Sequence, residues 1–241
     1  MIMRGLRWAP AAVFFVVGLA SAALGQGPPA QVIVRTDKTV DRVMAAAREW
    51  AREDAWDEAI RALQFILDDR NDTFLVREVR VAKDGAVETL FVSARSEAAR
   101  VLQALPAQGR EFYQFTYGPV ANALLGEAKT RSDLEEVVQR FLCTDAGTRA
   151  LELLATYHLD RGRYLSAARC YQALLDRSGL EQLKPVSLFK AALALHRAGE
   201  RAEGERAWQQ LAHKLGKEGL RIGDRTLTLE QLRQELEKAA P

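Results

Sequence analysis

Apolar residues recur at helical spacing through most of this chain, in pairs of segments separated by a short polar break. The first pair covers residues 40–50 and 57–67, where apolar positions fall three and four residues apart. The same arrangement recurs on either side of Gly162 and of Gly199. The pattern predicts a mainly helical protein in which amphipathic helices pack two by two.

A common set of offsets surrounds Asp54, Gly162 and Gly199. Residues suited to a core stand 11, 8, 7 and 4 positions before each centre and 5, 9 and 12 positions after it. A weaker copy surrounds Ser132. A glycine at the centre is typical of a helix that ends in a left-handed conformation, and aspartate tolerates that conformation less well, so we expect a looser turn at Asp54. Four copies predict an array of helical pairs.

Small residues occupy the places 7 before and 5 after each centre, as Ala155 and Ala167 do around Gly162. Small side chains let two antiparallel helices approach closely, while the larger residues around them fill the space alongside. His158 stands 4 residues before the same centre, at a packing position. We therefore interpret His158 as a partly buried core histidine rather than a catalytic base.

Two segments alternate like strands instead of helices. Residues 73–92 are rich in β-branched side chains on both sides of an Asp-Gly pair and predict a β-hairpin inserted into the helical array. Residues 220–227 predict a second, smaller hairpin by the same logic. Thr228 and Gln231 then have the spacing of a capping box, which predicts a final helix.

Between the first hairpin and the later helical pairs, the sequence predicts a helix over residues 96–105, which is followed by a group of aromatic residues. Helical spacing places Phe112, Phe115 and Tyr117 roughly on one core face and leaves Tyr113 to point elsewhere. Stacking on a ligand ring is the alternative use for such a group.

These offsets resemble the tetratricopeptide repeat (TPR) family, and residues 157–167 (YHLDRGRYLSA) carry the resemblance best. The resemblance implies an α-solenoid that binds protein or peptide segments. The centres lie 78, 30 and 37 residues apart, whereas the family period is about 34 residues. We therefore expect an irregular TPR-like α-solenoid over residues 40–241.

Residues 70–241 also resemble the N-terminal helical module of secreted planctomycete-type proteins that continue into a pyrroloquinoline-quinone-like (PQQ-like) β-propeller. FVSAR at 91–95, EFYQFTYG at 111–118 and LEQLRQEL at 229–236 are among the strings that carry this likeness. The sequence ends at Pro241, before a propeller blade, so quinone binding is not carried over and no cofactor is expected. The alternative function is that of the front module of such a propeller protein.

Residues 1–25 have the layout of a secretory signal peptide. A short basic start precedes the uncharged run 9–20, and small residues suited to cleavage after Ala22 or Gly25 follow. The run is shorter than the ~20 residues of a membrane-spanning helix, so we expect cleavage rather than a retained anchor. Residues 26–39 are predicted to be a linker. The mature protein is expected in the periplasm or outside the cell, without a membrane span.

The near-equal numbers of basic and acidic residues narrow the classes of partner that we expect. The chain has 34 basic and 32 acidic residues, and the surplus equals the two arginines of the leader, Arg4 and Arg7. A balanced mature surface supplies no general field for nucleic acid or anionic lipid, so neither is expected as a partner.

Two cysteines, Cys143 and Cys170, would meet an oxidising compartment after export and could form a disulfide. The alternative is that each is a small buried apolar residue. The sequence contains no HExxH, GxSxG or Walker motif and no Cys/His spacing suited to a metal, so no catalytic or metal-ligating residue is expected. A helical cell-wall hydrolase is a second alternative, and it would need an isolated carboxylic acid in a cleft.

In a TPR-like array the first helix of each pair lines the inner surface. Positions 10, 6 and 3 before each centre then offer an apolar strip with one charge of each sign, suited to a peptide segment with apolar anchors. The alternative is that the chain's own loops or a further domain cover this strip. The predicted partner-binding residues are Met44, Arg48, Glu152, Thr156, Phe189, Leu193 and His196.

Overall fold

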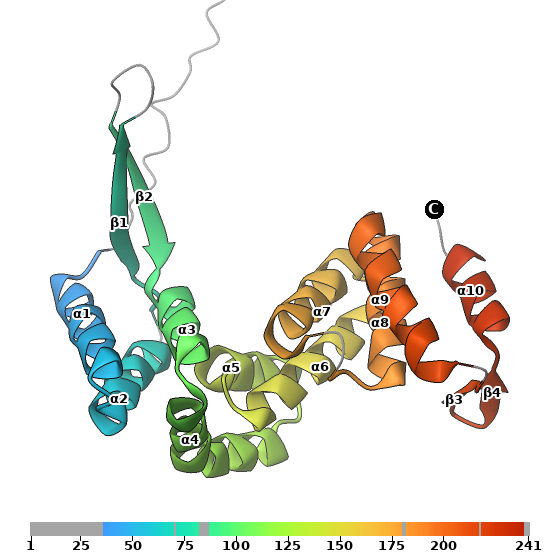
Figure 1. Cartoon of the computed structure of the whole chain (residues 1–241), viewed down its shortest axis with the longest axis horizontal. Helices are drawn as coiled ribbons and strands as arrows, with labels where there is room; N and C mark the ends of the chain where they lie inside the picture. The colour runs from blue at the N-terminus through green and yellow to red at the C-terminus, as the bar shows by residue number, and fades with distance from the viewer. Residues whose placement is uncertain (1–35, 70, 82–86, 180–181, 217, 239–241) are drawn as a thin grey trace, which may run out of the picture. The chain divides into compact units, whose positions relative to one another are not determined.

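The computed structural model describes residues 36–69, 71–81, 87–179, 182–216 and 218–238. Over these residues the chain is mainly helical, with ten α-helices and two antiparallel β-hairpins (Figure 1). The helices are α1 (Lys38–Arg52), α2 (Trp56–Asp68), α3 (Ala94–Ala104), α4 (Ala107–Glu127), α5 (Arg131–Phe141), α6 (Asp145–Asp160), α7 (Tyr164–Ser178), α8 (Pro185–Arg197), α9 (Arg201–Leu215) and α10 (Leu229–Lys238). The predicted leader and nearly all of the predicted linker lie outside the described residues, although α1 already begins at Lys38 within that linker.

Both predicted hairpins are present. Strands β1 (Phe74–Val81) and β2 (Val87–Ser93) pair antiparallel, with a register shift between Val76 and Glu78. The Asp-Gly turn expected between them lies outside the described residues. Strands β3 (Leu220–Ile222) and β4 (Arg225–Leu227) form the smaller hairpin.

The final helix begins with the expected capping box. The backbone N–H of Thr228 donates to Gln231 Oε1 at 2.9 Å, and the N–H of Gln231 donates to Thr228 Oγ1 at 3.3 Å. These two reciprocal bonds satisfy donors that the first turn of α10 would otherwise leave free.

Three interhelical turns are built alike. Asp54, Gly162 and Gly199 have φ angles of 58°, 66° and 90°, so all three are left-handed as expected. In each turn the N–H of the next residue donates at 2.9 Å to the carbonyl oxygen five residues earlier, for example from Arg163 to His158. The turn at Asp54 closes with the same bond as the glycine turns and is not looser. This hydrogen bond is the mark of a Schellman motif.

The prediction of a fourth interhelical turn centred on Ser132 is wrong. Ser132 lies inside the first turn of α5, and Thr130 caps that helix through a capping box with Asp133. Helix α4 ends at Glu127, and the following Ala128 is extended rather than left-handed. The link therefore lacks the shared motif, because the residue that follows α4 is extended rather than left-handed.

Helices α8 and α9 approach each other closely at Gly204. A Cβ atom placed on Gly204 would lie 3.3 Å from the carbonyl oxygen of Ala192 and 3.2 Å from the backbone nitrogen of His196. Ala155 and Ala167, the equivalent pair of α6 and α7, have no exposed surface and belong to one hydrophobic cluster. Small residues at these places thus pack inside the helical pairs, as their spacing indicates.

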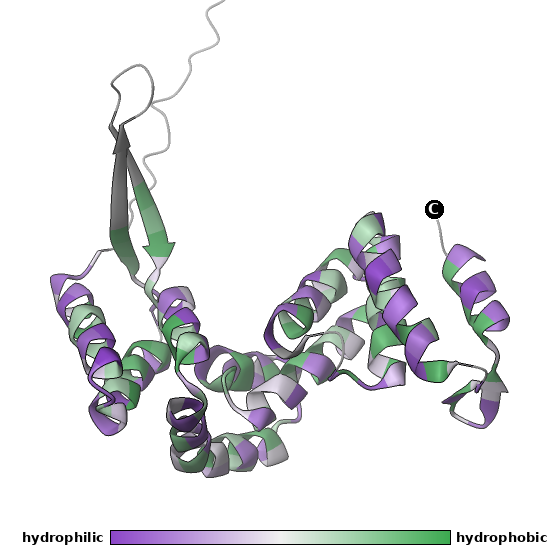
Figure 2. Cartoon of the chain, in the orientation of Figure 1, coloured by the Kyte–Doolittle hydropathy of each residue, from purple (hydrophilic) through white to green (hydrophobic). Residues whose placement is uncertain are grey.

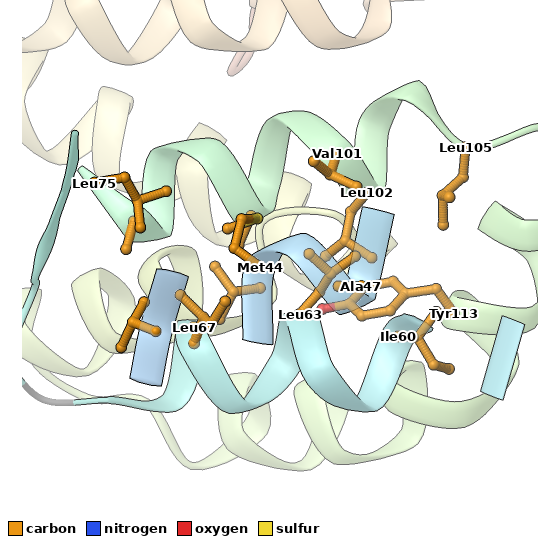
Figure 3. Close-up of a cluster of buried hydrophobic side chains, with 14 residues drawn as sticks. Met44, Ala47, Ile60, Leu63, Leu67, Leu75, Val101, Leu102, Leu105 and Tyr113 are labelled. Carbon is orange, nitrogen blue, oxygen red and sulfur yellow. The ribbon is translucent and has the colours of Figure 1, made fainter. Parts of the chain in front are cut away.

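The first four helices and β1 share a hydrophobic cluster, which we call the N-terminal cluster. Figure 3 shows Met44, Leu63 and Tyr113 among its side chains. Further clusters join α6 to α10, and a small one joins α4 to α6. The helices keep hydrophilic residues on their other faces (Figure 2). The N-terminal cluster consists of Val40, Met44, Ala47, Ile60, Leu63, Ile66, Leu67, Leu75, Ala94, Ala98, Val101, Leu102, Leu105 and Tyr113.

The prediction that Phe112, Phe115 and Tyr117 form the core face of α4 is wrong. Tyr113 is the buried ring, with 1% of its surface exposed, whereas Phe112 is 37% and Phe115 82% exposed. The ring of Tyr113 packs in the N-terminal cluster, and its hydroxyl donates at 2.8 Å to Oε1 of Gln64, a buried residue of α2. The bond offsets the cost of burying the hydroxyl, and helical spacing reveals neither the cluster nor this partner.

Candidate binding cavity

A cavity of about 880 Å³ is lined by α3, α4, α6, α7 and α8 and by the links that join them. Seven of the sixteen described residues that line it are charged, four basic and three acidic. Such a lining differs from the mostly apolar walls of ordinary small-molecule pockets. The charged lining residues are Arg100, Arg110, Asp145, Glu152, Asp176, Arg177 and Lys184.

Helix α6 supplies one wall through a stripe of polar residues. Asp145, Thr148 and Glu152 line the cavity and lie three and four residues apart, which places them on one helical face. The hydroxyl of Ser187, a buried residue of α8, donates to Glu152 Oε1. This bond holds the Glu152 carboxylate at the junction between α6 and α8.

The polar junction continues one turn along α6. Thr156 Oγ1 accepts a hydrogen bond from Lys190 Nζ at 3.1 Å and lies 3.4 Å from the hydroxyl oxygen of Tyr171. Burial raises the pKa of Tyr171, so its hydroxyl stays protonated at neutral pH. Side chains from α6, α7 and α8 are thus tied together next to the cavity.

Two arginines of the cavity lining are held by hydrogen bonds within the protein. Arg100 of α3 donates to both carboxylate oxygens of Glu97, at 2.9 and 2.6 Å. Arg110 of α4 donates to the carbonyl oxygen of Leu105 at 2.5 Å. Both guanidinium groups therefore reach the cavity already oriented, which lowers the entropy lost when a ligand binds.

Arg177 and Cys143 meet on another part of the lining. Burial raises the pKa of the Cys143 thiol, while the guanidinium of Arg177 opposes that rise by hydrogen bonding and charge. The thiol is therefore neutral near pH 7 and supplies no negative charge to Arg177. Nη1 of Arg177 is buried and has no hydrogen-bond partner among the described residues.

The predicted partner-binding residues fall in different environments. Glu152 lines the cavity, and Thr156 follows it on the same helix. Arg48 forms an ion pair at 2.5 Å with Glu97, whose side chain is 1% exposed, so it connects α1 to α3. Leu193 and His196 are half-buried and do not line this cavity.

Two of those residues do not fit the prediction of an accessible strip. Met44 is 1% exposed in the N-terminal cluster, and Phe189 is 8% exposed in a cluster of α8, α9, β3 and α10. A partner could reach neither without rearranging the helices. The reason is that α1 and α8 each pack on several neighbouring elements, so their predicted inner positions are enclosed.

The repeat offsets in the sequence did not predict most of the residues that line the cavity. Arg177 and Lys184 lie at the end of α7 and the start of α8, and Arg100 lies on α3, outside any predicted pair. One feature of the sequence pointed to the cavity. Asp145, Thr148 and Glu152 are polar residues three and four positions apart, so they form a polar stripe on a helix whose other face is apolar.

Cys143 and Cys170 are both free thiols in the structure. Cys143 packs against the N-terminal cluster, whereas Cys170 packs against a cluster of α6 to α10. Burial raises the pKa of Cys170 as it does that of Cys143, so each thiol behaves as a small apolar side chain near neutral pH.

A second groove, of about 600 Å³, runs between α1 and α2 and is apolar. Val43, Trp50 and Phe65 line it, and Phe65 is 60% exposed. In the described part of the chain, no group of three or more His, Cys, Asp or Glu residues is placed to hold a metal ion. None of the helices described is both long and apolar enough to cross a bilayer.

Comparisons with protein-family models, with curated proteins and with solved structures gave no match. The resemblances to the TPR family and to the propeller-associated module stay predictions. A function for this chain is therefore argued from the cavity and the residues that build it.

Proposed function

We propose that this chain is an exported, non-enzymatic TPR-like scaffold that binds a segment of another protein in the cavity between α3, α4, α6, α7 and α8. The observation that carries the proposal is the cavity of about 880 Å³ with fixed charges of both signs. Export is proposed from the signal-peptide layout of residues 1–25.

The repeated turns support a TPR-like arrangement. The pairs α1–α2, α6–α7 and α8–α9 have the same left-handed residue and the same closing hydrogen bond. Each pair also buries a small residue on both helices at the same distance from the turn. One local unit used three times is what an array of repeats requires.

The chemistry of the lining supports a peptide segment as the ligand. Peptides offer backbone hydrogen-bonding groups together with acidic and basic side chains, which match a wall that carries both signs of charge. Bonds such as Ser187–Glu152 and Arg110–Leu105 orient the wall before a ligand arrives. A preorganised polar wall favours specific binding because less side-chain freedom is lost.

The test is a peptide selection on the purified chain, followed by binding to a variant with an obstructed cavity. Ala104 is exposed and lines the cavity, so Ala104→Trp should occupy part of it without disturbing the core. Ala123, exposed on α4 and outside the cavity lining, gives the matched control Ala123→Trp. We expect the selected peptides to bind Ala104→Trp at least about tenfold more weakly than the wild type and the control.

Two results would contradict the proposal. The first is a selection that yields no peptide with reproducible affinity for the wild-type chain. The second is a set of peptides that bind Ala104→Trp and Ala123→Trp equally well, because their binding surface would then lie away from the cavity.

A further inference from the structure

The charged groups of the cavity differ in whether the protein satisfies them. Glu152 accepts from Ser187, and Asp176 accepts from Gln172 Nε2 at 2.8 Å. Arg100 and Arg110 donate to Glu97 and to the Leu105 carbonyl. Of the lining residues only Arg177 has a buried side-chain nitrogen or oxygen atom without a hydrogen bond in the described structure.

A buried donor on a cation is costly to leave unpaired. Its natural neighbour, the Cys143 thiol, carries no charge near neutral pH because burial raises its pKa. What the cavity lacks at Arg177 is therefore an acceptor with negative charge.

The start of α8 adds further donors to the same cavity lining. Lys184 lines the cavity and is the N-cap residue of α8, yet no side chain caps this helix. Pro185 follows as the first helical residue and has no N–H, so Val186 and Ser187 present the first free backbone donors. A helix N-terminus and an ammonium group both favour an anion.

We infer that Arg177 and Lys184 form an oxyanion subsite of the cavity, which binds a carboxylate or phosphate group of the ligand. This inference rests on the proposed function and specifies its chemistry: the bound segment carries an acidic side chain, a chain-terminal carboxylate or a phosphorylated residue. The guanidinium offers paired N–H donors to two oxygens of the anion, and Lys184 contributes charge. Asp176 and Glu152 face the same space and limit the total negative charge that the cavity accepts.

The test titrates the purified chain with succinate and, separately, with inorganic phosphate, at constant ionic strength set with chloride. The thermal midpoint and the calorimetric affinity are measured for wild type, Arg177→Gln, Lys184→Gln and Arg149→Gln. Arg149 is an exposed arginine of α6 that does not line the cavity, so its variant controls for lost surface charge.

We expect one anion or both to raise the midpoint of the wild type and of Arg149→Gln. Arg177→Gln should lose at least about tenfold in affinity and Lys184→Gln about threefold. A stronger response to succinate assigns the group as a carboxylate, and a stronger response to phosphate assigns it as a phosphate.

Equal responses of all four proteins, or no response of the wild type, would overturn the subsite. The two proposals also fail separately. If selected peptides bind in the cavity but tolerate Arg177→Gln, the scaffold function stands and the oxyanion subsite falls. If no peptide binds while an anion still binds through Arg177, the subsite stands and the scaffold function falls.

Discussion

Replacing glycine by alanine should have opposite effects at two helical positions of this chain. Gly147 lies in the first turn of α6, and Gly126 lies near the end of α4. A Cβ atom on Gly147 would lie 1.9 Å from the carbonyl oxygen of Phe141 and 2.5 Å from its carbonyl carbon. A Cβ atom on Gly126 would meet no atom within 4 Å. The two substitutions therefore change the same side chain in contrasting surroundings.

The structure gives the size of the destabilisation expected for Gly147→Ala. Cβ atoms essentially never come within 3.0 Å of such neighbours, so the Phe141 carbonyl and the first turn of α6 would have to separate by roughly 1 Å. Forced packing of this kind costs about 1–3 kcal/mol or more. The shift also strains the cap, in which the Gly147 N–H donates to Thr144 Oγ1 at 3.0 Å, and losing a cap costs about 0.5–2 kcal/mol.

Alanine recovers about 0.5–1 kcal/mol in either helix, because glycine loses more backbone freedom on folding. We therefore expect Gly147→Ala to lower the free energy of unfolding by about 1–4 kcal/mol and Gly126→Ala to raise it by about 0.5–1 kcal/mol. At about 2–4 °C per kcal/mol, the midpoints should fall by about 2–16 °C and rise by about 1–4 °C.

Urea and thermal unfolding followed by far-ultraviolet circular dichroism measure both changes. A Gly147→Ala variant that is as stable as the wild type would refute the reasoning, because the close approach of Phe141 to α6 would then be absent. Gly126→Ala serves as the control for helix propensity alone, and it should retain the wild-type peptide binding.

Three further changes test the packing. Tyr113→Phe leaves buried Gln64 without its donor and should cost about 1–2 kcal/mol in urea unfolding. Burial lowers the pKa of His158 below its ordinary value of 6.5, so the unfolded chain binds more protons than the folded chain in this range. The free energy of unfolding should therefore fall as the pH drops from about 7.5 to 5.5. His158→Phe should flatten that pH profile, and an unchanged slope would contradict the assignment. Ala167→Trp overpacks the α6–α7 contact and should cost at least about 1–3 kcal/mol, whereas unchanged melting would argue against the helical register.

The sequence by itself determined the features that depend on near neighbours. The left-handed turns at Asp54, Gly162 and Gly199 and the Thr228–Gln231 cap close with hydrogen bonds between residues at most five positions apart. The hairpins follow from segments that alternate like strands, although the β1–β2 pairing itself reaches from Phe74 to Ser93. Dihedral preferences and local bonding therefore reveal these features before any packing is known.

Only the tertiary structure decided which faces are buried and where the cavity lies. Tyr113, not Phe115, enters the core, where it packs on α1, α2 and α3 and its hydroxyl has Gln64 of α2 as a buried partner. The cavity unites the ends of α3 and α7 with the face of α6, whose residues lie far apart in the chain. Such a lining results from the packing of several helices at once, and the periodicity of one helix records only that a face is apolar, not which element covers it.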